Sequence, residues 1–278
     1  MSNRYVVAVS GGVDSVVLLH MLKGRPELEL VVAHFDHGIR DDSADDAKFV
    51  SDLAKSYGLT FETKRETLGK DASEELARDR RYAFLRDVAK KYDAQIATAH
   101  HSDDAIETVA INLTRGTGWR GLAVLDSEVI RPLLNMSKQE ILGYAKLHDL
   151  QWREDSTNAS DNYLRNRVRR KTDKLSSDEK RQLLSLRSHQ IHSKKLIDNE
   201  VLKLVGGGPN YSRYFFTHTN ETTAIECLRS VMFAKLTRPQ LKRLLLAIKT
   251  SKSGSVYQAG NGLQITFTSR NFTVELIK

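Results

Sequence analysis

The sequence of 278 residues contains one cysteine, Cys227, and no apolar run that approaches the ~20 residues of a membrane-spanning helix. A single cysteine excludes an internal disulfide, a Cys-x-x-Cys zinc site and any redox or sulfur-transfer motif that needs two thiols. The first residues lack the basic and then apolar layout of a secretory signal peptide. We therefore expect a soluble, cytoplasmic protein with no membrane partner.

The sequence also lacks the strong compositional bias of disordered or collagen-like chains, because 40% of its residues are hydrophobic and 28% are charged. Lys and Arg number 43 against 35 Asp and Glu, which leaves a formal charge of +8. This balance favours polyanionic partners, although it does not by itself indicate nucleic acid. At roughly 150 residues per domain, the length predicts about two domains.

Short apolar runs alternate with helical patterns through the first half of the chain. We expect strands at 4–9, 29–35, 60–64 and 94–99, and one more at 129–131 before Pro132. Helical spacing is found at 16–23, 44–57, 73–92 and 103–114. This alternation predicts an α/β fold with a doubly wound parallel sheet that carries helices on both faces.

The second half has a different pattern. Ser137 and Glu140 form a capping box that opens a helix, and residues 162–205 are helical and basic up to the glycine-proline break at 206–209. Two helices at 222–235 and 239–249 and a two-strand hairpin at 264–268 and 272–277 are expected beyond it. We therefore predict an α/β catalytic domain at 1–170, a basic helical linker at 171–209 and a small α+β domain at 210–278.

A glycine turn between the first strand and the first helix is the sharpest candidate for a ligand site. Its residues are Ser10, Gly11, Gly12, Val13, Asp14 and Ser15. Glycines allow a close backbone approach, and the turn's amides together with the positive end of the helix favour an anion. The lysine of the classical phosphate loop does not follow. The charge of Asp14 would repel a phosphate unless Mg²⁺ or a backbone amide intervenes.

Acidic residues follow the second and fourth predicted strands. Asp36 comes directly after the second strand, whereas Asp104 and Glu107 are three apart on a helix and therefore share a face. Doubly wound folds bind ligands at this carboxyl edge, although Asp104 and Glu107 also suit a helix dipole as first-turn acids. His100 and His101 could ligate zinc, but adjacent histidines do not easily face one ion. We expect no metal site built from protein ligands alone.

Taken in order, these motifs resemble a known family. The turn at 10–15 resembles the pyrophosphate (PP) loop of the ATP-pyrophosphatase superfamily. With the stretches at 33–40, 74–82, 100–108, 115–122, 153–158 and 162–169, residues 4–170 resemble the tRNA(Ile)-lysidine synthase family. The resemblance implies a Rossmann-like PP-loop domain that uses ATP and Mg²⁺ to adenylate C2 of the wobble cytidine (position 34) in the CAU anticodon of tRNA(Ile). Free L-lysine then displaces AMP to give lysidine.

The resemblance also implies roles for individual residues. Residues 10–15 would hold the pyrophosphate end of ATP, and Asp36 would lie near ATP and the metal. Asp104 and Glu107 would lie at the reacting centre, with Arg81 and Arg169 nearby as phosphate or base contacts. A carboxylate suits this chemistry, because the amine of lysine, with a pKa of about 10.4, must lose a proton before it attacks. The chain departs from the family at Ala105, where glutamine is usual.

Other functions remain open at this stage. A tRNA thiolase of the same superfamily commonly uses paired cysteines, which this chain lacks. A small-molecule amide-forming synthetase would not need the basic helical arm. A non-catalytic RNA-binding protein would not need the complete set of loop and acidic residues. Residues 210–278 resemble the first C-terminal domain of the family only loosely, and we expect them to contact tRNA; a homodimer is a further expectation.

Overall fold

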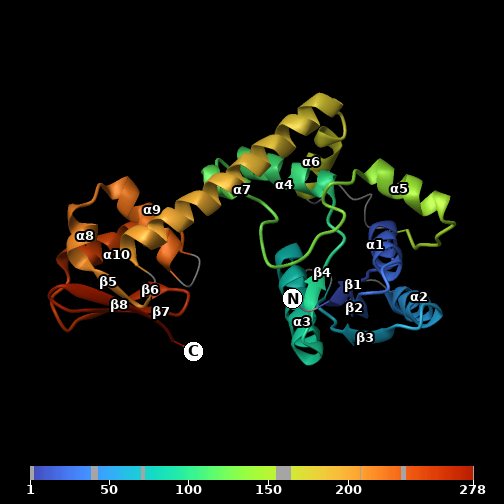
Figure 1. The fold of residues 1–278 in the computed structure, drawn as a ribbon, viewed down its shortest axis with the longest axis horizontal. Coiled ribbons are helices and arrows are strands. Elements are labelled where there is room, and N and C mark those ends of the chain that lie inside the picture. Colours follow the sequence, from blue (N-terminus) through green and yellow to red (C-terminus); the bar gives the residue numbers. More distant parts are fainter. Residues whose placement is uncertain are drawn as a thin grey trace. The chain divides into compact units, whose positions relative to one another are not determined.

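The computed structural model describes residues 3–38, 43–69, 73–154, 164–206, 208–232 and 236–277 (Figure 1). The chain forms two compact units, Met1–Ser188 and His189–Lys278. The division into three parts at 170 and 209 stays a prediction. Within the described residues, no helix combines the length and the apolar character needed to span a bilayer.

The first unit contains a parallel sheet of four strands. These are β1 (Arg4–Ala8), β2 (Glu29–Asp36), β3 (Thr60–Arg65) and β4 (Gln95–Ala97), in the order β3-β2-β1-β4. The fifth strand predicted at 129–131 is reduced to a single bridge between Ala97 and Ile130. Pro132, which has no N–H to donate, follows at once and prevents a longer ladder.

Helices cover both faces of this sheet. Val7, Val32 and Ala97 pack on one face with α1 (Val13–Lys23), α2 (Ser43–Ser56) and α5 (Lys138–Leu147). Val6, Val31 and Ala33 point to the opposite face, against α3 (Glu74–Tyr92). Successive strand residues face opposite sides, so a strand covered on both faces carries a nearly continuous apolar run, as β2 does at 30–33 and Phe35. The doubly wound fold predicted from the sequence is confirmed.

The other helices of this unit follow β4 in the sequence. They are α4 (Ser102–Thr114), the short 3₁₀ helix η1 (Trp119–Leu122), α6 (Leu164–Thr172) and the first part of α7 (Ser177–Val205). The capping box that begins α5 is confirmed, because Ser137 N donates to Glu140 Oε2 at 2.7 Å and Glu140 N to Ser137 Oγ at 3.2 Å. It places Lys138 in the first turn of α5.

The second unit contains an antiparallel sheet in the order β5-β8-β7-β6. Its strands are β5 (Asn210–Ser212), β6 (Val256–Gly260), β7 (Leu263–Phe267) and β8 (Asn271–Leu276), and its helices are α8 (Arg213–His218), α9 (Glu221–Val231) and α10 (Arg238–Thr250). The hairpin predicted at 264–268 and 272–277 corresponds to β7 and β8, which form only the centre of this sheet. The sequence pattern missed β5 because it has three residues, and β6 because its alternation is weak. Helix α9 ends at Val231 rather than 235, and positions 233–235 lie outside the described residues.

Candidate active site

The glycine turn leads from β1 into α1. Gly11 has a φ of +95°, which side-chain-bearing residues rarely adopt, and Gly12 is the N-cap of α1 with an ordinary φ of −71°. Ser15 Oγ donates to the Gly12 carbonyl at 2.8 Å and accepts from Ser10 N at 3.2 Å, so the turn is tied to the first turn of the helix. The first amides of a helix have no intrahelical partner, which makes this turn suited to an anion.

Replacing Gly11 by alanine is expected to destabilise the protein by about 1–2 kcal/mol, because the strain comes from the positive φ. There is space for the added methyl group, whose nearest neighbours are Phe49 and Val50 at 3.6 Å. Gly12→Ala is the matched control, since its backbone is ordinary and its Cβ would lie 3.7 Å from Ser10 Oγ. Urea unfolding measures both variants, and an equal loss in the two would contradict the strain argument.

A lysine from α5 lies beside this turn. Lys138 Nζ is 2.6 Å from Asp14 Oδ1, and the two side chains are 41% and 31% exposed. The backbone N of Lys138 donates to Asp103 Oδ2 at 2.8 Å, which ties α5 to α4. The charge of Asp14 is therefore met by an ammonium group. No local pattern in the sequence indicates this role of Lys138, because 124 residues separate it from Asp14.

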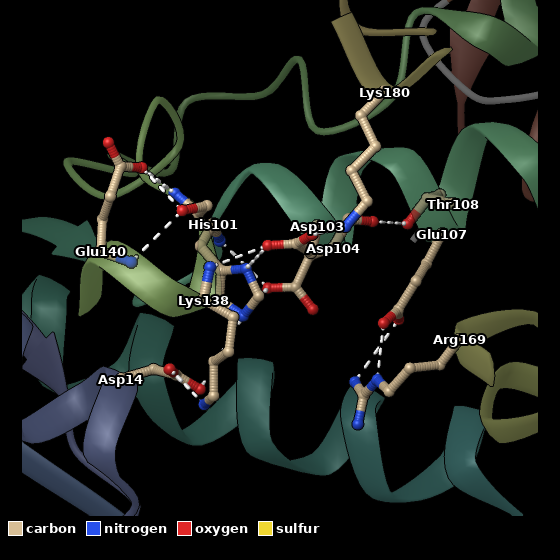
Figure 2. A network of polar contacts seen from close by, with 11 residues as sticks. Asp14, His101, Asp103, Asp104, Glu107, Thr108, Lys138, Glu140, Arg169 and Lys180 are labelled. Carbon is tan, nitrogen blue, oxygen red and sulfur yellow. Dashed lines mark hydrogen bonds and ion pairs between the residues drawn. The ribbon is translucent and has the colours of Figure 1, made fainter. Parts of the chain in front are cut away.

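Three carboxylates surround His101, which precedes α4 (Figure 2). Asp14, Asp103 and Asp104 lie 3.9, 3.7 and 3.6 Å from its ring nitrogens, and its side chain is 8% exposed. Asp104 Oδ2 also accepts a hydrogen bond from His101 N at 3.0 Å. Burial by itself lowers the pKa of His101, but its contact with Asp103 and the charges of Asp104 and Asp14 outweigh burial and raise the pKa above 6.5.

Asp103 has the opposite shift. Its contact with His101 lowers its pKa most, and although burial acts in the other direction, bonds from Lys138 N and from Lys180, whose Nζ is 3.1 Å from Asp103 Oδ1, lower the pKa further. Lys180 lies on α7 and was also missed by sequence reasoning. Sequence separation is again the reason, because no local pattern joins residues 77 positions apart.

The charge of His101 predicts a pH-dependent stability. Because its pKa is raised in the folded state, its contribution is complete below about pH 6.5, the value for an unfolded chain, and is lost as pH rises through the folded pKa. The difference in unfolding free energy between wild type and His101→Gln should therefore shrink as pH rises above about 6.5 and through the folded pKa. Urea titrations across this range measure it. A difference that stays constant with pH would contradict the assignment, and Asp103→Asn should weaken the trend.

Glu107 and Arg169, both predicted site residues, form an ion pair. Arg169 Nε on α6 donates to Glu107 Oε1 at 2.5 Å, and Arg169 Nη2 is 3.4 Å from Glu107 Oε2. The Glu107 side chain is 2% exposed, whereas that of Arg169 is 37% exposed. Figure 2 shows Asp104 and Glu107 on one helix, with Asp104 toward His101 and Glu107 toward Arg169.

Asp36 and Arg81 lie on other elements: Asp36 is at the carboxyl edge of the sheet, and Arg81 is on a helix and acts on that edge through its charge. Asp36 ends β2, is 5% exposed, and accepts from Gly38 N at 2.8 Å, with Arg65 Nε 3.4 Å from its other oxygen. Arg81 lies on α3 beside Tyr82. After burial, which has the larger effect, the charge of Arg81 lowers the pKa of His37, the residue after Asp36.

The charge of Arg81 also lowers the pKa of His100. Burial first, and then the charges of Arg131, Arg78 and Arg81, lower the pKa of His100 to about 4, against the opposing charge of Asp104. A neutral His100 is therefore expected at neutral pH. Arg81 thus acts electrostatically on residues that follow both β2 and β4.

Arg153 supports the glycine turn from outside. Its backbone N donates to the Gly11 carbonyl at 3.0 Å, and its Nε donates to Asp46 at 2.6 Å on α2. The stretch at 153–158 is one of the motifs of the family resemblance, but the contact of Arg153 with the glycine turn has no local signature in the sequence. In the part of the chain that the structure describes, no three His, Cys, Asp or Glu side chains are placed to hold a metal ion.

The chain is similar to a known domain family and to several curated enzymes that share one name. A family model described as "PP-loop domain" matches residues 1–175. The chain is 42% identical over 184 residues to a tRNA(Ile)-lysidine synthase of Bacillus cereus, which covers 59% of this chain and 38% of that protein. It is 41% identical over 177 residues to one of Thermotoga maritima, covering 59% of this chain and 43% of that protein. The chain thus spans about two fifths of the length of these relatives.

Among solved structures, a U34-tRNA thiolase of Methanococcus maripaludis matches with a TM-score of 0.57 at 20% identity, covering 68% of this chain and 72% of that chain. At this identity the match shows a shared fold. It agrees with the parallel sheet and the helices of the first unit.

Proposed function

The chain belongs to the PP-loop domain family, and on that basis we propose that it is an ATP-dependent, tRNA-modifying ligase of the tRNA(Ile)-lysidine synthase type. The observation that carries the substrate assignment is the 42% identity with an enzyme of that name. The proposed substrates are ATP, free L-lysine and a tRNA(Ile) with a CAU anticodon. A cytoplasmic location follows from the same proposal.

The proposed reaction has two steps. In the first, O2 of the wobble cytidine attacks the α-phosphorus of ATP and pyrophosphate leaves, so cytosine C2 acquires a good leaving group. In the second, the ε-amine of lysine forms a bond to C2, the C2–O2 bond breaks, and AMP departs with that oxygen. The lysine ammonium group loses one proton before the attack, and the nitrogen bonded to C2 loses a second as AMP leaves. Binding of the phosphate chain is proposed for residues 10–15, where Gly11 has a positive φ and α1 begins.

Asp104 is the carboxylate that we propose to bind the lysine ammonium group and accept its proton. It lies at the start of α4 and is 9% exposed, so its charge acts in a region with little water to screen it. We propose that Glu107 holds Arg169 in position, as their contact at 2.5 Å supports. The Arg169 guanidinium would then face the nucleotide or the cytidine.

The residues present also fit a magnesium ion held jointly with phosphate. Mg²⁺ prefers carboxylate oxygens and is commonly bound by one or two carboxylates together with substrate phosphates. Asp36, which is 5% exposed at the end of β2, is the residue that we propose to hold it. The ion would neutralise charge on the phosphate chain. The charge of Arg81 lowers the pKa of His37, which is next to Asp36. We propose that Arg81 also neutralises charge on the phosphate chain.

A reconstituted reaction tests the proposal. The purified chain is incubated with ATP, Mg²⁺, labelled lysine and a transcribed CAU-anticodon tRNA, and lysine in RNA is measured together with AMP and pyrophosphate. We expect lysine incorporation equal to AMP release, and none into a control transcript that differs only at the wobble base. AMP release without tRNA would instead favour a small-molecule synthetase. Sulfur transfer is disfavoured, because the one cysteine, Cys227, is 1% exposed.

A further inference from the structure

The loop that follows η1 brings two arginines together. Arg187, on the first part of α7, donates from Nε to the Val124 carbonyl at 2.9 Å. Arg131 donates from Nη1 to the carbonyls of Leu125 and Val129, at 3.0 and 2.9 Å. Val124 and Leu125 are consecutive residues, whose Cα atoms are about 3.8 Å apart. Arg131 and Arg187, here called the arginine pair, are therefore held close to each other.

The backbone of this loop is strained between the two contacts. Leu125 has a φ of +54°, a left-handed conformation that a bulky side chain rarely adopts. Such conformations persist where surrounding contacts hold them, and they cluster at binding and catalytic sites. Here the arginine pair supplies contacts on both sides of the strained residue, and Arg131 Nη2 donates a further bond to Ser127 Oγ at 3.0 Å. The loop and the arginine pair therefore fix each other's positions.

The two guanidinium groups repel each other. Burial first, and then the charge of Arg131, lower the pKa of Arg187. Burial also lowers the pKa of Arg131, and the charge of Arg78 lowers it further. The charge of Asp126 opposes both shifts but does not cancel them. Like charges at a half-buried site are unfavourable, so an anion that contacts both guanidinium groups would relieve the repulsion.

The position of the arginine pair narrows the class of anion. Arg78 lies on α3, with its guanidinium carbon 5.0 Å from the centroid of the Tyr82 ring. Tyr82, and Val129 beside the pair, pack on the face of the sheet that α3 covers, whereas the glycine turn leads into α1 on the opposite face. The turn is the proposed site for the phosphate chain of ATP. The other polyanion among the proposed substrates is the RNA, whose backbone carries a phosphate at every nucleotide.

We propose that Arg131 and Arg187 together bind one backbone phosphate of the RNA substrate, and that Arg78 adds to the positive charge around it. The planar N–H donors of a guanidinium group match the oxygens of a phosphate. Both side chains of the pair are half-buried, so each keeps a part that can contact a ligand. The inference rests on the proposed function in that it takes the substrate to be RNA. It does not depend on the amine or on the anticodon.

The test measures the binding of the transcribed CAU-anticodon tRNA and of ATP to the full chain at several salt concentrations. Arg187→Gln should weaken tRNA binding by about 10-fold, the effect of a lost hydrogen bond between charged groups. The slope of log affinity against log salt should become shallower by about 1, because one phosphate contact is lost. ATP binding should be unchanged. An unchanged tRNA affinity, or a loss for ATP as large as that for tRNA, would overturn the proposal.

Two further variants separate phosphate binding from a structural role of Arg187. Arg187→Lys keeps the charge, so it should retain the salt slope of wild type although the Nε contact with Val124 is lost. Arg181→Gln is the matched control and should bind tRNA as wild type does, because Arg181 lies about 9 Å away along the same helix and 3.9 Å from Asp178.

Each variant can also contradict the proposal. Equally shallow salt slopes in Arg187→Lys and Arg187→Gln would show that Arg187 only supports the loop, and the proposal would be wrong. A loss of tRNA affinity in Arg181→Gln as large as that in Arg187→Gln would indicate general attraction to a basic helix. That result would overturn the proposal of a defined phosphate site.

The same measurements distinguish this inference from the proposed function. If the wild-type chain binds no tRNA, the proposed function fails and this inference fails with it. If wild type incorporates lysine into tRNA and Arg187→Gln binds tRNA as tightly as wild type, only the inference about the arginine pair is wrong.

Discussion

Asp104→Asn is expected to lower turnover by about 10²- to 10⁴-fold, the contribution of a positioned general base. The substitution removes the charge that we propose to bind the lysine ammonium group. Asparagine still offers an oxygen to His101 N, which Asp104 accepts at 3.0 Å, so the start of α4 should be retained. Single-turnover assays of lysine incorporation measure the loss, and filter binding should give a tRNA affinity within about twofold of wild type.

Asp103→Asn is the matched control for this prediction, because it makes the same chemical change one residue away. Asp103 is tied to Lys138 N and Lys180, so its loss should reduce stability more than it reduces turnover. Wild-type turnover in Asp104→Asn would refute a catalytic role for Asp104. Loss of tRNA binding in that variant would assign it to RNA recognition instead.

Arg169→Met is expected to destabilise the protein by about 2–3 kcal/mol. Removing one partner of a buried ion pair costs roughly 3–5 kcal/mol. The Arg169 side chain is 37% exposed, so water screens the pair and the expected cost falls to the lower end of this range or below it. The cost arises because the carboxylate of Glu107, 2% exposed, loses the cation that faces it. Urea unfolding measures the change. The double variant Glu107→Gln with Arg169→Met should recover part of the loss, because it also removes the buried charge.

Arg170→Met provides the comparison on the same helix. Arg170 is exposed, so its loss should change stability by less than about 0.5 kcal/mol. If α6 binds RNA, the slope of log affinity for tRNA against log salt should fall by about 1 in Arg170→Met. A smaller change is expected in Arg169→Met, because Glu107 already meets that charge. Equal stability of Arg169→Met and Arg170→Met would contradict the proposal that Arg169 stabilises the fold through Glu107 whereas Arg170 does not.

Most of the fold of the first unit could be predicted, because each of its elements leaves a local pattern. The nearly continuous apolar run of β2 predicts a strand, and α5 begins where Ser137 and Glu140 cap it. The second unit was predicted less completely. The three residues of β5 pair with β8, about 60 positions away, and so short a segment carries no periodicity of its own.

For the site, the sequence by itself determined which chemical groups are present and the local shape of the turn. The positive φ at Gly11 and the spacing of Asp104 and Glu107 are properties of a few neighbouring residues, and the parallel order of strands brings their ends to one edge. Only the tertiary structure decided which opposite charges meet. Lys138 faces Asp14, and Arg169 faces Glu107, 62 positions away. Such pairs depend on how separate helices pack, and packing brings together residues that no pattern along the chain connects.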